Sequence, residues 1–92
     1  MTVEAQGDVD TARSWYEDQK PGLGADFVRE ALDAFDRIGE SPTLYPAVHR
    51  RIRRVGLKTF KYSAYYRVLA DHVEVVGVIH DRRDLVNLLK RL

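Results

Sequence analysis

Side chains that could act on a phosphate lie in the second half of the chain. Lys61 and Arg67 belong to the stretch FKYSAYYRV (residues 60–68), and His80 and Arg83 follow it. Metal-free RNA cleavage needs a base for the 2′-hydroxyl proton, an acid for the leaving oxygen and cations for the phosphorane. Histidine as a residue type exchanges protons near neutral pH, so His80 could serve as acid or base, with Arg67, Arg83 and Lys61 supplying charge.

The same residues also allow two other interpretations. In a binding platform, Tyr65 would stack on a base or on a partner's side chain, while arginines such as Arg82 would hold phosphate or carboxylate. In a purely structural sheet, Arg67 would pair with Glu74 and His80 would simply end a strand. The residues by themselves leave all three interpretations open.

A dense basic run, HRRIRR, precedes this stretch at residues 49–54. Its alternation predicts a strand over residues 49–55, with Arg51 and Arg53 on one side, Arg50 and Arg54 on the other, and Ile52 inward. Such a strand could be a solvated edge that resists aggregation. The density of charge favours a docking site for an acidic segment or a phosphate backbone, with Arg51, Arg53 and Arg54 as its contacts.

Charge is distributed unevenly along the chain. Residues 1–46 hold four Lys and Arg against ten Asp and Glu, a net charge of −6, and residues 47–92 hold eleven against four, a net charge of +7. A basic half attracts phosphates or an acidic partner protein. The alternative is that the two halves neutralise each other within the fold.

Composition narrows the class of protein. The chain has 92 residues and no cysteine, and its three histidines lack the spacing of metal ligands. We therefore expect a single domain over residues 1–92 with no disulfide, metal or other cofactor. The start lacks a signal-peptide pattern and no apolar run is long enough to span a membrane, which predicts a cytoplasmic protein with no membrane partner.

The spacing of apolar residues changes from a helical to a strand period along the chain. It predicts helices over residues 8–19 and 25–38, the first capped by Asp8 and ended by Lys20-Pro21-Gly22. Beyond Pro46 it predicts three strands, over residues 49–55, 58–69 and 73–79. A short C-terminal helix capped by Asp84 would follow. The predicted fold class is α+β, with an antiparallel helix hairpin packed on a small antiparallel sheet.

The pairing of the last two strands decides which side chains share a face. With Asp71 and His72 as a two-residue loop, Val68 would lie opposite Val75 and Ser63 opposite His80. One face would then be apolar and covered by the helices. The other would be a polar and aromatic surface carrying Tyr65 and His80, because a one-residue slip would mix the two faces.

Several short motifs follow one another in a characteristic order. They are Trp15-Tyr16-Glu17, Pro21-Gly22-Leu23-Gly24, Phe27, Pro42, Tyr45-Pro46, Ile52-Arg53-Arg54, Tyr62, Tyr65-Tyr66-Arg67-Val68, Val78, His80 and Arg82-Arg83-Asp84. Together they resemble the RelE/ParE superfamily of toxins from bacterial type II toxin–antitoxin modules, over nearly the whole chain.

The resemblance implies a growth-inhibiting toxin that a cognate antitoxin neutralises. Its target would be DNA gyrase, as for ParE-like members, or mRNA on the translating ribosome, as for RelE-like members. Arg83 matches a catalytic arginine of the nuclease members, but Ser63 stands where they carry another arginine and Leu89 where they carry a ring. These departures favour a non-nuclease, ParE-like toxin; any enzymatic activity would be metal-independent, ribosome-dependent endoribonuclease activity.

Members of the superfamily usually begin with a strand, and here this strand is short or missing. The sheet would then keep one open edge for an antitoxin strand or a second copy, giving a toxin–antitoxin hetero-oligomer or a homo-oligomer. The alternative function is a decayed, non-toxic binding protein that retains affinity for antitoxin or nucleic acid.

Overall fold

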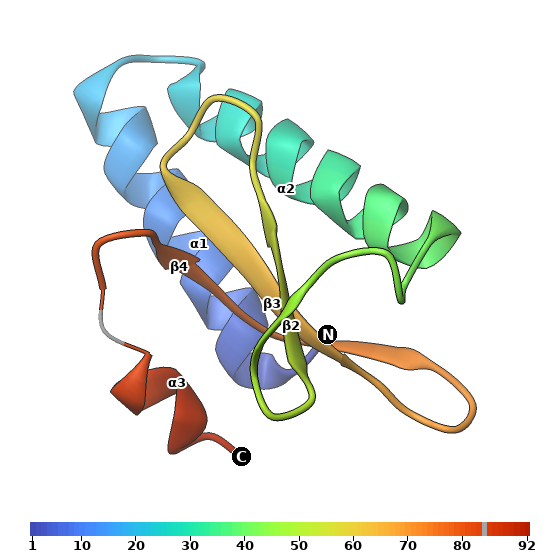
Figure 1. Ribbon diagram of the computed structural model, residues 1–92. Helices are drawn as coiled ribbons and strands as arrows, with labels where there is room; N and C mark the ends of the chain where they lie inside the picture. Colours follow the sequence, from blue (N-terminus) through green and yellow to red (C-terminus); the bar gives the residue numbers. More distant parts are fainter. Residues whose placement is uncertain (84) are drawn as a thin grey trace.

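Two helices precede a four-stranded sheet and a final short helix (Figure 1). The computed structural model describes residues 1–83 and 85–92. The elements are α1 (Val3–Gln19), α2 (Leu23–Glu40), β1 (Ala47–His49), β2 (Ile52–Gly56), β3 (Tyr62–Val68), β4 (Val73–His80) and α3 (Val86–Leu89). The strands lie in the order β1-β2-β3-β4, and every neighbouring pair is antiparallel. The predicted α+β class is confirmed.

The helix hairpin is closed by a sharp turn and a close contact. Gly22 has a φ of 93°, a left-handed conformation that glycine adopts without strain. The Glu17 carboxylate accepts hydrogen bonds from the amides of Gly22 (3.1 Å) and Gly24 (3.0 Å). A Cβ on Gly24 would lie 2.7 Å from the carbonyl oxygen of Arg13, so this position allows α1 and α2 to approach closely.

The first helix begins earlier than its sequence pattern indicates. Thr2 is the N-cap, and its hydroxyl accepts a hydrogen bond from Ala5 N at 3.1 Å. The prediction of Asp8 as the cap is wrong, because this carboxylate faces β4 and accepts a hydrogen bond from Val78 N at 3.0 Å. Compared with the predicted helix, α1 therefore has about one and a half additional turns at its start, and these pack along the sheet.

The main core lies between the helix hairpin and one face of the sheet. Phe27 from α2 contacts three other aromatic rings, with centroids 5.5 Å from Tyr16, 5.3 Å from Phe60 and 5.0 Å from Tyr62. Tyr66 is fully buried here, and its hydroxyl donates to the Pro42 carbonyl at 2.6 Å. This cluster covers Phe60, Tyr62, Ala64 and Tyr66, as the alternation of FKYSAYYRV predicts, whereas Val68 at the end of β3 is exposed.

A second, smaller core covers the opposite face of the sheet. It consists of Ile52, Tyr65, Val76, Ile79 and Leu88, with Leu85 packed against it. Leu88 belongs to α3, so the C-terminal segment shields this face from solvent. Tyr65 and Val76, in the middle of the predicted polar surface, are therefore interior.

The basic run forms two strands joined by a tight turn. β1 ends at His49 and β2 begins at Ile52, and Arg50 between them has a φ of 50°. The single strand predicted over residues 49–55 is wrong, and the sheet gains a strand at its edge. Since a run of arginines cannot be buried, placing two of them in a turn keeps their charges in water.

The register of β3 and β4 also differs from the prediction. The loop spans residues 69–72, closed by a hydrogen bond from Leu69 N to the His72 carbonyl at 2.8 Å, and Val68 pairs with Val73. An irregularity follows, because Tyr66 pairs with Val75 and Tyr65 with Gly77. β4 therefore contains a one-residue bulge, which shifts the register by one residue, and the alternation of apolar residues does not predict such a shift. His80 consequently lies opposite Tyr62, not Ser63.

The outer edge of β4 is occupied by groups from both ends of the chain. Thr2 N donates a hydrogen bond to the Val75 carbonyl at 3.0 Å. Residues 1 and 2, before α1, are not part of a strand. Arg91 donates to the Val76 carbonyl (3.2 Å) and binds the Asp8 carboxylate at 2.6 and 2.9 Å. The predicted capping residue of the C-terminal helix, Asp84, lies outside the described residues.

Candidate functional site

The structure separates the four side chains predicted to be catalytic. Lys61 directly precedes β3, and Arg67 lies six residues further along the chain, about 20 Å at the usual rise of an extended chain. Arg67 binds the Glu74 carboxylate through two nitrogens, at 3.0 and 2.7 Å. It therefore has the structural partner that the third interpretation of the sequence gave it, and it is remote from His80.

The other three predicted catalytic residues gather at the opposite end of the sheet. His80 turns toward α1, where its ring meets Tyr62 edge to face at 5.2 Å. Its Nδ1 accepts a hydrogen bond from Arg82 N at 3.1 Å, so in the neutral ring the proton is on Nε2. Lys61 and Arg83 are exposed. Burial raises the pKa of Tyr62 above its ordinary value, although the positive charge of Arg83 acts in the opposite direction.

Ser63 is the buried member of a polar bridge between strands, whose other members, Asp81 and Arg54, are partly exposed. Its side chain is fully buried, and its hydroxyl donates to the Asp81 carboxylate at 2.6 Å. The same carboxylate oxygen accepts from Arg54 at 3.2 Å. Burial lowers the pKa of Arg54, but Asp81 and Tyr65 outweigh it and leave this pKa above its ordinary value. Ser63 and Arg54 thus stabilise the sheet where β2 and β3 meet the end of β4.

Two further residues predicted to bind a partner instead contact other parts of the same domain. Tyr65 is only 4% exposed, so its ring faces the second core and is not available for stacking. Arg53 donates to the carbonyls of Thr43 (3.1 Å) and Tyr45 (2.6 Å), which fixes the connection between α2 and β1. Of the five residues predicted to bind a partner, Arg51 and Arg82 are the exposed ones.

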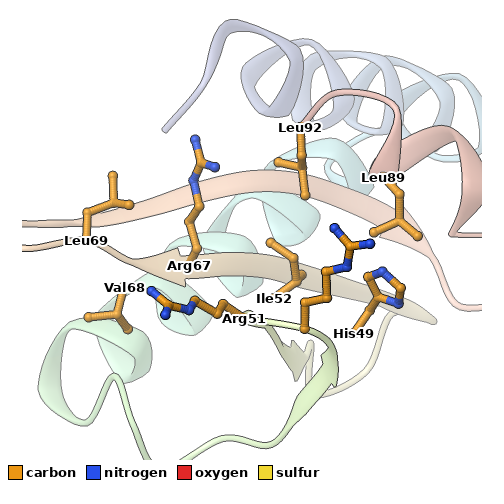
Figure 2. Close-up of a pocket in the computed structure, with 9 residues that line it drawn as sticks. His49, Arg51, Ile52, Arg67, Val68, Leu69, Leu89 and Leu92 are labelled. Atoms are coloured by element: carbon orange, nitrogen blue, oxygen red, sulfur yellow. The ribbon is translucent and has the colours of Figure 1, made fainter.

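A groove of about 640 Å³ opens beside the turn between β1 and β2 (Figure 2). We call it the basic groove. It is lined by His49, Arg50, Arg51, Ile52, Arg67, Val68, Leu69, Leu89 and Leu92. In Figure 2, Leu89 and Leu92 reach it from the C-terminal segment, and Leu89 lies on the same side of Ile52 as His49. Sequence reasoning identified its arginines but missed these leucines, because only the folding of α3 under the sheet brings them there.

The chemistry of the basic groove is amphipathic. Leu69, Leu89 and Leu92 offer apolar surface, and Leu92 is about half exposed. Arg50 and Arg51 are exposed, and neither forms an ion pair with any residue that the structure describes. A segment with acidic side chains on one side and apolar side chains on the other would satisfy both parts of the groove.

Other classes of site find no support among the described residues. In residues 1–83 and 85–92, no group of three or more His, Asp or Glu side chains is placed to hold a metal ion. Within the same residues, no helix has the length and apolar character needed to cross a membrane.

The architecture is that of a small α+β domain whose surface carries an amphipathic groove rich in arginine. Over residues 1–85 the sequence matches the family described as ParE toxin of type II toxin-antitoxin system, parDE. The chain belongs to this family of toxins, which confirms the resemblance to the RelE/ParE superfamily. A search of curated proteins returns no match to the chain.

Proposed function

We propose that this protein is a growth-arresting toxin whose target is DNA gyrase and whose activity is neutralised by a cognate antitoxin. Membership of the ParE toxin family gives the type II toxin–antitoxin setting and an antitoxin partner. The choice of gyrase over mRNA on the ribosome rests on the site. The observation that most supports gyrase as the target is the separation of Arg67 from His80.

A metal-free nuclease would need its acid, base and cations around one phosphate. Here Arg67 is bound to Glu74 at one end of β3, whereas His80 packs on Tyr62 at the other end. Ser63, where the nuclease members carry an arginine, is buried and hydrogen bonded to Asp81. These placements support a toxin that acts by binding its target.

The target can be assigned with one preparation of purified toxin. We expect the toxin to inhibit DNA supercoiling by gyrase and to leave ribosome-bound mRNA uncut. Cleavage of mRNA at ribosomes together with normal supercoiling would refute the proposal and support the nuclease interpretation. Binding of antitoxin without growth arrest on induced expression would instead indicate a decayed toxin.

We further propose that the antitoxin places an acidic, amphipathic segment in the basic groove. Arg51 lies at its rim with no ion pair among the described residues, and the apolar side chains of Leu89 and Leu92 lie across from it. An acidic segment would neutralise the rim while its apolar side chains cover the leucines. The net charge of +7 on residues 47–92 would also speed the encounter.

The test compares two charge reversals on exposed arginines. Arg51→Glu should weaken binding of the antitoxin encoded beside the toxin gene by about tenfold or more, since like charges face each other at the rim. Arg13→Glu, on the exposed side of α1, makes the same change of charge away from the groove and should bind normally. Equal affinity of both variants would place the antitoxin elsewhere on the toxin.

A further inference from the structure

A second hollow, of about 380 Å³, is lined by residues of α1 and by residues at the end of the sheet where β3 begins and β4 finishes. We call it the aromatic hollow. It is lined by Thr11, Ala12, Trp15, Tyr16, Tyr62 and His80. It shares no lining residue with the basic groove, so it is a separate feature of the surface.

Four of the six lining residues carry aromatic rings. Trp15 is 57% exposed and meets Tyr16 edge to face, with centroids 5.0 Å apart. Tyr62 and His80 form a second edge-to-face pair at 5.2 Å. A large indole left in water beside other rings is unusual for a side chain with a purely structural role, since tryptophan is normally well buried. The hollow therefore offers flat apolar surface to a planar ligand.

Cations surround the same end of the sheet. Lys61 and Arg83 are held beside the hollow by backbone hydrogen bonds, from Asp81 N to the Lys61 carbonyl (2.8 Å) and from Arg83 N to the His80 carbonyl (2.9 Å). Arg82 follows directly on Asp81. Lys61, Arg82 and Arg83 are all exposed, and none of the three forms an ion pair with a described residue.

Acidic groups near the hollow are mostly neutralised. Asp8 is paired with Arg91 and Asp81 with Arg54. Asp18, three residues after Trp15 on α1, is exposed and has no ion pair within the described part of the chain. Among the residues that the structure describes here, three unpaired cations against Asp18 leave a net positive charge, which suits an anionic ligand.

We propose that the aromatic hollow binds one nucleotide of a single-stranded nucleic acid, with its base against Trp15 and Tyr62 and its phosphates on Arg82 and Arg83. Stacking on aromatic side chains beside backbone-tracking cations is how proteins hold unpaired bases. His80, with its proton on Nε2, supplies a hydrogen-bond donor in the same hollow. A duplex keeps its bases stacked inside and would not fit.

This proposal does not depend on gyrase or on the antitoxin. It relocates the stacking role that the sequence suggested for Tyr65, which is buried, to Trp15 on the other side of the sheet. The two sources of the ligand, single-stranded DNA and RNA, present the same base and phosphate chemistry and are distinguished by the test.

Trp15 is the only tryptophan of the chain, so its fluorescence reports on the hollow directly. We expect oligonucleotides of about 12 nucleotides, one of DNA and one of RNA, to quench it saturably at about 50 mM salt, and the matching duplex not to do so. Tighter binding of one oligonucleotide identifies the source. No quenching by either would refute the proposal.

Variants distinguish base stacking on Trp15 from general electrostatic attraction between the protein and the phosphates. Binding is followed by the fluorescence anisotropy of a labelled oligonucleotide. Trp15→Ala should weaken binding by at least about fivefold and Trp15→Phe should restore most of it. Leu32→Ala, which removes a similarly exposed apolar side chain from α2, is the matched control and should bind normally. Equal loss in Trp15→Ala and Leu32→Ala, or quenching by the antitoxin and not by oligonucleotides, would overturn the assignment.

Discussion

The ion pair between Asp8 and Arg91 ties both ends of the chain to the outer edge of β4. Arg91 binds both carboxylate oxygens, at 2.6 and 2.9 Å, and the same carboxylate accepts from Val78 N at 3.0 Å. The two side chains are only 11% and 22% exposed, so water cannot replace a lost partner well. The hydrogen bonds to Asp8 keep the pKa of Arg91 above its ordinary value, against a smaller effect of burial.

Asp8→Ala should destabilise the protein substantially. The change leaves the Arg91 guanidinium without its counter-charge and Val78 N without its acceptor. Breaking a buried pair costs about 3–5 kcal/mol, and the partial exposure of Arg91 reduces this to about 2–4 kcal/mol. In a domain of this size that loss lowers Tm by about 10–25 °C. Far-UV circular dichroism during thermal and urea unfolding measures both quantities.

A double-mutant cycle tests the reasoning behind this magnitude. Arg91→Ala also removes the bond to the Val76 carbonyl, and the cycle with Asp8→Ala subtracts that contribution. We expect the double variant to be more stable than the sum of the single losses predicts, by at least about 1 kcal/mol. Additive losses, or a loss below about 1 kcal/mol for Asp8→Ala, would show that the pair does not hold the two ends of the chain.

Two further predictions concern the helix hairpin and its contact with the sheet. Gly24→Ala should lower the free energy of unfolding, measured in urea, by about 1–3 kcal/mol, because its Cβ would meet the Arg13 carbonyl. Gly39→Ala, with open space around it, is the control and should stabilise α2 by about 0.5–1 kcal/mol. No loss of stability in Gly24→Ala would mean that the two helices can move apart easily. Burial raises the pKa of Glu30, but hydrogen bonds from the hydroxyl and amide of Thr59 and from neighbouring amides outweigh it and leave this pKa below its ordinary value of 4.5. The lowered pKa adds stability that is complete above that ordinary value and is lost as the pH falls through the lowered one. Glu30→Gln should therefore be less stable than the wild type near neutral pH, with a difference in urea midpoint that shrinks on acidification; a constant difference would exclude titration of Glu30 as its cause.

The helix hairpin and the strand identity of residues 62–68 and 73–80 follow from the sequence alone. Apolar residues at steps of three and four predict α2, and Lys20-Pro21-Gly22 predicts the turn before it, since both signals are local. Alternation in the same way placed Tyr62, Ala64 and Tyr66 toward the helices. The family resemblance likewise needed only the order of short motifs.

Tertiary structure decided which residues share a site. A one-residue bulge in β4 turned His80 toward Tyr62, and alternation contains no signal for such a step. Burial of Tyr65 depends on Leu88, which is remote in sequence and reaches the sheet only after α3 folds beneath it. The same segment brings Leu89 and Leu92 to the basic groove that Arg51 also lines. Periodicity specifies the faces of each element, but contacts between distant segments determine which faces stay in water, and so where this toxin can bind.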